Sequence, residues 1–206
     1  MVRSNPERAE ATRTALLDAG RALFVSRGYG GTSTPEICGA AGITRGALYH
    51  HFDDKRDLFR AVLMREARAV SAAIEGAAPA QATPRQALLA GSLAYLDAMT
   101  VAGRTRLLLI EGPAVLGAAE VMAIDASHAA GTLREGLAAA LGAEPVAIDA
   151  LAKLLSAAFD RAALEIDAGS GAQEVRSAML WLLERVLGPA AASQGQSGVA
   201  DPEEKM

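Results

Sequence analysis

The sequence predicts an all-α protein of about nine helices. Alanine, leucine and glycine dominate the 206 residues, 51 % of which are hydrophobic, and aromatic residues make up only 4 %. Apolar residues recur at helical spacing, whereas the β-branched and aromatic runs that strands use are scarce. A chain of this length and composition can bury a sizeable core by packing helix against helix.

A first helix is expected over residues 10–27, where leucine and phenylalanine side chains follow helical spacing. Gly28 can end it as a C-terminal cap, and the glycine pair at 30–31 cannot cheaply continue a helix. We therefore expect the chain to turn at this point.

A second, very short helix is expected over 34–41. Ser33 followed by Glu36 matches a capping box, and a Thr34 cap with Pro35 at the first helical position fits equally well. The side chains expected to face inward are Ile37, Ala40 and Ala41. Cys38 on the same helix is more simply a small buried filler than a redox sensor.

A third short helix is expected from about 44 to 52, after a tight turn at Gly42. Thr44 can cap it, and Leu48 and Phe52, four residues apart, would face a core. Two short helices joined in this way have the spacing of a helix-turn-helix, whose second helix enters the DNA major groove.

The opposite face of the third helix carries Gly46, Ala47 and His50. Glycine in the first turn weakens a helix by up to ~1 kcal/mol relative to alanine, but small side chains let the backbone approach base edges. Arg45 can reach guanine or a phosphate, and Tyr49, on the flank, suits a phosphate oxygen. This face therefore predicts DNA recognition.

A fourth helix is expected over 55–75, capped by Asp53 or Asp54. Lys55 in its first turn adds a cation beside free backbone N–H groups, which favours anion binding. The stretch 76–84, rich in alanine and proline, is typical of a break between domains.

Five further helices are expected, and Pro113 is the expected cause of the break after the second of them. They lie near 84–103, 104–112, 118–142, 146–168 and 172–188. Residues 190–206 have no period and are rich in small and polar residues, so we expect a disordered tail.

The charge is unevenly distributed. Residues 1–60 hold nine Lys/Arg and seven Asp/Glu, whereas the whole chain has a net charge of -4. A mildly basic N-terminal part in an otherwise acidic chain is compatible with local DNA contact. The single cysteine excludes an internal disulfide framework, and no apolar run is long enough for a signal peptide or a membrane span. We expect a soluble cytoplasmic protein that contacts no membrane.

Residues 12–59 resemble the DNA-binding region of the TetR family of ligand-responsive bacterial repressors. The matching features are Gly28–Tyr29, Thr32–Ser33, the AAG turn at 40–42, Gly46, the LYxHF run at 48–52, and Lys55. The resemblance implies an all-helical fold: a helix-turn-helix DNA-binding domain (1–54), a connector helix (55–75), and a ligand-binding and dimerisation domain (76–189).

The resemblance also implies which residues meet DNA. Phosphate contacts would come from Thr34, Tyr49 and Lys55, with His50, and base contacts from Arg45, Gly46 or Ala47, with Thr44 at the helix start. One departure is Pro35, where many relatives carry a long polar side chain, so an operator cannot be taken over from a relative.

For the rest of the chain the resemblance implies a homodimer, which would read a palindromic double-stranded operator, and a small-molecule inducer. The wide apolar faces of 146–168 and 172–188 suit a dimer seam. The candidate pocket residues are Tyr95, Met99, Leu109, Met122, Asp125, His128 and Phe159. The inducer itself is not indicated.

Other functions are less well supported by the residues. No catalytic arrangement of side chains is found, so we expect no enzyme and no cofactor. His50 and His51 diverge by ~100° on a helix and lack a further ligand at helical spacing, so we expect no metal site. His51 is expected to pack rather than to bind DNA. The main alternative is a helical protein-interaction or small-molecule-binding module that no longer binds DNA.

Overall fold

The computed structural model describes residues 5–142, 147–169 and 171–189, and every regular element in this part of the chain is helical. The prediction of an all-α fold is confirmed. The elements are α1 (Asn5–Arg27), α2 (Thr34–Ala41), α3 (Arg45–His51), α4 (Lys55–Gly76), α5 (Pro84–Met99), the π-helix η1 (Arg106–Glu111), α6 (Gly112–Leu116), α7 (Ala118–Ala126), α8 (Ala129–Leu141), α9 (Ile148–Asp167) and α10 (Ala172–Val186). The tail expected at 190–206 lies outside the described residues.

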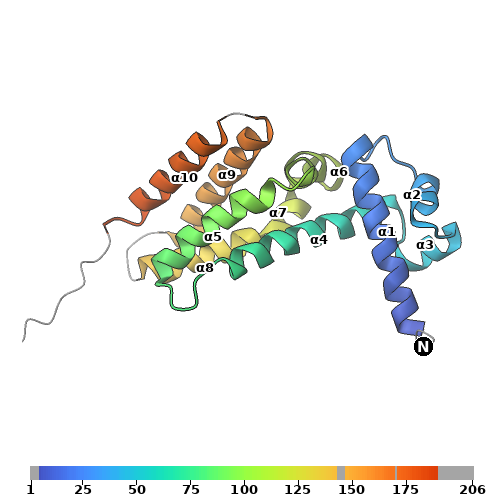
Figure 1. The fold of residues 1–206 in the computed structure, drawn as a ribbon, viewed down its shortest axis with the longest axis horizontal. Helices are drawn as coiled ribbons and strands as arrows, with labels where there is room; N and C mark the ends of the chain where they lie inside the picture. The colour runs from blue at the N-terminus through green and yellow to red at the C-terminus, as the bar shows by residue number, and fades with distance from the viewer. Residues whose placement is uncertain (1–4, 143–146, 170, 190–206) are drawn as a thin grey trace, which may run out of the picture.

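The helices form an elongated molecule (Figure 1). Helices α1, α2 and α3 gather at one end, and α4 runs from them along the remaining helices, with α9 and α10 toward the other end. None of the described helices is both long enough and apolar enough to cross a membrane.

Local hydrogen bonds define α2. Glu36 Oε2 accepts from the Ser33 backbone N–H at 2.8 Å and from the Ser33 hydroxyl at 2.7 Å. Ser33 is therefore the N-cap, and the alternative Thr34 cap is wrong. The inward face was only partly predicted: Ile37 and Cys38 are buried, whereas Ala40 is exposed. Burial of the neighbouring Cys38 turns α2 so that Ala40 falls on its solvent side.

The turn and the following helix start as expected. Gly42 ends α2 with φ +67°, a left-handed conformation that glycine adopts without a Cβ penalty. Thr44 then caps α3, because its hydroxyl oxygen accepts from the Ala47 N–H at 3.2 Å. Both predictions are confirmed, and α2 and α3 together form the helix-turn-helix.

Helix α1 begins five residues earlier than predicted, at Asn5. Pro6 lies in its first turn, where a missing N–H removes no intrahelical hydrogen bond. Glu7, also in the first turn, complements the positive end of the helix dipole. Both residues therefore favour the longer helix.

The break predicted at Pro113 is wrong. The chain stays helical from 104 to 116 through η1, in which the Gly112 N–H bonds to the Leu107 carbonyl five residues back. Pro113 then occupies the first turn of α6, where it is tolerated. The helical run ends instead at Gly117, whose φ of +91° favours glycine.

The single helix predicted over 118–142 is also wrong, because it divides into α7 and α8 at Ser127 and His128. The Ser127 hydroxyl donates to the Ala123 carbonyl at 3.0 Å, a local bond that competes with helix continuation. A Cβ added to Gly131 would lie 2.6 Å from the Ala126 carbonyl oxygen, so the close approach of the two helix ends requires glycine.

Helices α1 to α4 share a core with the helices that follow them, which form the body of the molecule. Phe24 and Phe59, on α1 and α4, meet edge to face with ring centres 5.0 Å apart. Leu107 of η1 and Leu116 of α6 are buried in the same cluster. A second cluster joins α5, α8, α9 and α10. The η1–α6 segment thus contacts the helix-turn-helix end directly.

Candidate DNA-binding surface and ligand cavity

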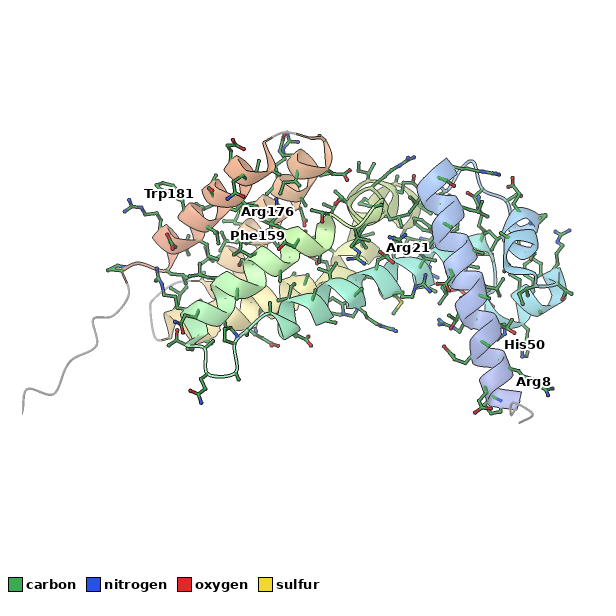
Figure 2. The ribbon with its side chains drawn as sticks, in the orientation of Figure 1. Arg8, Arg21, His50, Phe159, Arg176 and Trp181 are labelled. Atoms are coloured by element: carbon green, nitrogen blue, oxygen red, sulfur yellow. The ribbon has the colours of Figure 1, made fainter. Side chains whose placement is uncertain are left out.

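Helix α3 presents the predicted face. Leu48 and Phe52 are buried in the core, at 0 % and 3 % exposure, while Gly46 and His50 are exposed. Tyr49 is 49 % exposed, so its ring reaches solvent. His50 lies at the far end of the molecule from Trp181 (Figure 2).

Two polar side chains of α3 have no hydrogen-bond or ion-pair partner among the described residues. Arg45 is exposed, and its guanidinium makes no hydrogen bond or ion pair with the described residues. The same holds for the Tyr49 hydroxyl. Ala47 and Thr34 are half-buried. His51 is half-buried, and its ring contacts those of His50 and Phe52.

Lys55 has a structural role that the sequence did not show. Its Nζ donates to the Tyr29 carbonyl at 2.9 Å and to the Thr32 carbonyl at 2.8 Å, and it lies 4.0 Å from the centre of the Tyr29 ring. The ammonium group thus holds the turn after α1 against the start of α4. One of its three N–H donors makes no hydrogen bond with a described residue.

Replacing Lys55 with methionine should lower the free energy of unfolding by about 1–3 kcal/mol without any DNA present, because two carbonyl groups lose a charged donor. Urea unfolding followed by circular dichroism measures this. Lys153→Met, at an exposed position on α9, is the control and should change little. If Lys55→Met unfolds like the unaltered protein but binds DNA weakly, the carbonyl contacts contribute nothing and phosphate binding is its main role.

Three clusters of polar contacts among the described residues connect this end of the molecule to the remaining helices. At the first, Glu66 of α4 is 4 % exposed and accepts from Arg21 Nε at 2.8 Å and from Arg104 Nε at 2.8 Å. Burial by itself would raise the pKa of Glu66, but the hydrogen bonds and charges of the two arginines outweigh it and hold the pKa below its usual value.

The other two contacts involve the η1–α6–α7 segment. The Tyr29 backbone N–H donates to Glu111 Oε2 at 2.8 Å. Arg56 donates to the Leu116 carbonyl at 3.0 Å and to Glu120 at 2.9 Å, and Arg60 also pairs with Glu120. A shift of this segment would therefore act directly on α4 and on the turn after α1.

Two adjoining cavities lie in the body. One has a volume of about 340 Å³ between α4, α5, α8 and α9, and the other about 240 Å³ between α4, α5, η1, α7 and α9. They share Tyr95, Asp125 and Ala129. The volume of the larger cavity is that of a small-molecule site.

The cavities contain most of the predicted pocket residues. Tyr95, Asp125 and Phe159 line the larger one. Tyr95, Met99, Leu109, Met122 and Asp125 line the smaller one. His128 lines neither, because it lies at the unexpected break between α7 and α8. Met122 is 65 % exposed, so it lies at the rim.

Sequence reasoning missed the polar partner of Tyr95. The Tyr95 hydroxyl donates to Asp160 Oδ1 at 2.6 Å. Burial raises the pKa of Asp160 to about 6; the Tyr95 hydrogen bond opposes that rise, and the charge of Asp125 adds to it. Burial also raises the pKa of Asp125, against hydrogen bonds from the Ala130 N–H and Ser156. Asp160 directly follows a buried phenylalanine on an apolar helix, which was the available signal.

Comparison with known proteins identifies the family. Residues 16–62 match the family model described as bacterial regulatory proteins, tetR family. Residues 85–189, more than half of the chain, match the tetracyclin repressor-like C-terminal domain. The chain belongs to the TetR family.

Individual TetR-family relatives agree with this assignment. The chain is 49 % identical over 59 residues to the HTH-type transcriptional regulator AcrR of Shigella flexneri, covering 29 % of this chain and 27 % of that protein. It is 45 % identical over 65 residues to the HTH-type transcriptional repressor BepR of Brucella suis, covering 32 % and 31 %. The chain thus spans less than a third of the length of these curated relatives.

A solved structure covers much more of the chain. A TetR-family transcriptional regulator from Pectobacterium atrosepticum superposes with a TM-score of 0.66 at 27 % identity, over 90 % of this chain and 96 % of that one. The similarity therefore extends from the helix-turn-helix through the cavity-bearing helices.

Proposed function

We propose that this TetR-family protein is a sequence-specific DNA-binding transcriptional regulator, a repressor that a small-molecule inducer releases from its operator. The observation that carries the proposal is the exposed face of α3, on which Arg45 and Tyr49 have no competing partner within the described residues. Free cationic and hydroxyl donors on a groove-sized helix suit base edges and phosphates.

The proposed contacts keep the residues expected from the sequence. Arg45, Gly46 and Ala47 meet base edges, with Thr44 beside them. Thr34, Tyr49 and His50 meet phosphates, and Lys55 uses its remaining N–H. As a DNA regulator the protein would act in the cytoplasm and would perform no enzymatic reaction.

The proposed protein acts as a homodimer through α9 and α10. Leu154 on α9 is 72 % exposed, and Trp181 and Leu182 on α10 are 58 % and 36 % exposed. Large exposed apolar side chains on two neighbouring helices are typical of an interaction surface. Two copies would place two α3 helices on successive major-groove faces of a palindromic operator, ~34 Å apart.

Release by an inducer follows from the contacts of the η1–α6–α7 segment. Leu108, Leu109 and Pro113 line the smaller cavity on this segment. Glu111 and Glu120 on the same segment bind the turn after α1 and the start of α4. A ligand that fits only one position of the segment would therefore favour one arrangement of the two α3 helices.

Fluorescence anisotropy on duplex DNA from the region flanking the protein's own gene tests the proposal. Arg45→Ala should weaken binding by about tenfold or more, since one lost base contact costs about 1–3 kcal/mol. Arg134→Ala is the matched control, because this exposed arginine of α8 pairs with Asp149 and with no other described residue. Its DNA affinity should be unchanged.

Salt and competitor complete the test. Binding to the operator should weaken steeply as salt rises and should resist scrambled competitor DNA. If neither the flanking region nor a selection from random sequences yields preferred DNA, the protein is instead an interaction module that no longer binds DNA.

A further inference from the structure

The charged residues of the two cavities are all acidic. Glu75, Asp125 and Glu135 line the larger cavity, and Asp125 and Asp160 line the smaller one. No lysine, arginine or histidine is among the lining residues that the structure describes. Glu75 and Glu135 are exposed, whereas the two aspartates are largely buried. The field inside the cavities is therefore negative.

Among the described residues, the two buried aspartates have only neutral hydrogen-bond partners. Asp125 Oδ2 accepts from the Ser156 hydroxyl at 3.3 Å, and Asp160 Oδ1 accepts from the Tyr95 hydroxyl. Neither carboxylate forms an ion pair with a described residue. The charge of His128 acts on Asp125 from outside the cavity walls. Buried carboxylates without a counter-charge are rare, because desolvation penalises the ion.

A third group independently points to a ligand. Ser92 of α5 lines the larger cavity and is 6 % exposed, and its hydroxyl is the one buried side-chain polar atom in the described part of the chain without a hydrogen-bond partner. Buried polar groups are normally paired. Its oxygen is available to accept a hydrogen bond from a group inside the cavity.

The remaining walls are apolar and partly aromatic. Leu88, Leu133 and Phe159 line the larger cavity, and Met99 and Leu109 line the smaller one. The Phe159 and Tyr95 rings meet edge to face with centres 5.8 Å apart, and Phe159 lies among the helices of the body (Figure 2). Aromatic faces attract cations as well as apolar groups.

We propose that these cavities bind a lipophilic organic cation, an amine or quaternary ammonium ion with an aryl or alkyl body. The positive charge lies near Asp125 and Asp160, where the two cavities meet, and the apolar body lies against Leu88 and Phe159. Anions are disfavoured, since every charged group in the walls would repel them. This inference rests on the proposed function only in giving the cation the role of inducer.

Isothermal titration with three probes of one shape tests the charge preference. The probes are 4-phenylbutylamine, the neutral 4-phenylbutanol and the anionic 4-phenylbutyrate. We expect the amine to bind at least about tenfold more tightly than the alcohol, and butyrate to bind most weakly. Equal affinities, a preference for butyrate, or no binding of the amine at millimolar concentration would each overturn the proposal.

A double variant, Asp125→Asn with Asp160→Asn, locates the charge. In this variant the amine should bind no more tightly than the alcohol, and the affinity for the alcohol should be unchanged. Asp149→Asn, outside the cavities, is the matched control and should keep the tighter binding of the amine. Thermal unfolding checks that each variant is folded, and Ser92→Ala provides a milder second variant, in which the amine should lose less affinity than in the double variant. If the amine still binds more tightly than the alcohol in the double variant, the proposal is contradicted.

The pH dependence gives a further readout. Tyr95 of α5 and Asp125 of α7 are the titratable groups that act on Asp160, whose pKa is about 6. Above this pH Asp160 is ionised and attracts the amine, and at pH 5 it is mostly protonated. Amine affinity should therefore fall by about tenfold from pH 7 to pH 5, while the affinity for the alcohol stays constant. A constant amine affinity would contradict the assignment to Asp160.

DNA titration separates this inference from the proposed function. If the amine binds as expected and weakens operator binding, both stand. If the amine binds as expected but operator binding is unchanged or undetectable, the cation site stands and the inducer role fails.

Discussion

Replacing Glu66 with glutamine should lower the free energy of unfolding by about 3–5 kcal/mol, since removing one partner of a buried ion pair leaves an uncompensated charge. Glu66 is 4 % exposed and lies between Arg21 and Arg104, whose side chains are 24 % and 11 % exposed. The amide keeps the shape but cannot neutralise two guanidinium groups. Urea unfolding at pH 7 measures the loss.

The pH dependence of the same change has a defined sign. The pKa of Glu66 is lowered in the folded protein, so its ionisation contributes stability above the unfolded pKa, and that contribution is lost as the pH falls through the folded value. The difference in stability between the unaltered protein and Glu66→Gln should therefore shrink in acid.

Asp18→Asn is the control for this prediction. Asp18 pairs with Arg65 of α4 at 2.6 Å, but its side chain is 65 % exposed, and exposed pairs contribute about 0–1 kcal/mol. A Glu66→Gln variant that unfolds at the same urea concentration as Asp18→Asn would contradict the structural role of the cluster.

The helix-turn-helix could be predicted from the sequence because its signals are local. Ser33 with Glu36, Gly42 and Thr44 each act within four residues along the chain, as the structure confirms. Helical spacing likewise placed Leu48 in the core. Such short-range interactions do not depend on what the rest of the chain does.

Two predictions failed on short-range features that helical spacing does not reveal, whereas the structural role of Lys55 depends on residues distant in the chain. Pro113 does not break its helical run, because η1 precedes it and places it in the first turn of α6. The division between α7 and α8 depends on the contact of Gly131 with the Ala126 carbonyl. Lys55 has the spacing of a phosphate ligand, yet it bonds to two carbonyl groups more than twenty residues away.

The polar contacts of the candidate cavity likewise join residues distant in the chain and could not be predicted from the sequence. The candidate pocket residues that accompany the family resemblance include Tyr95, but the pair of Tyr95 and Asp160 joins positions 65 residues apart. Glu66 lies on the buried stripe between Val62 and Val70, so a charge inside an apolar stripe was a usable signal. Its arginine partners could be found only from the fold.

Replacing both Leu154 and Trp181 with arginine should convert the protein to a monomer and weaken operator binding by about 10²–10⁴, because the second half-site contact is then no longer intramolecular. The two side chains are 72 % and 58 % exposed on α9 and α10, so the unaltered monomer leaves them in water. Four arginines facing one another across a symmetric seam would repel. Light scattering after gel filtration and DNA anisotropy measure the two effects.

Val101→Arg is the matched control, since Val101 is 43 % exposed in the turn after α5 and lies outside both helices. It should remain dimeric and bind DNA normally, and thermal unfolding should show both variants folded. A double variant that stays dimeric would place the seam on another surface. A monomeric variant with full operator affinity would mean that one α3 helix suffices, which contradicts recognition of a palindrome by a pair.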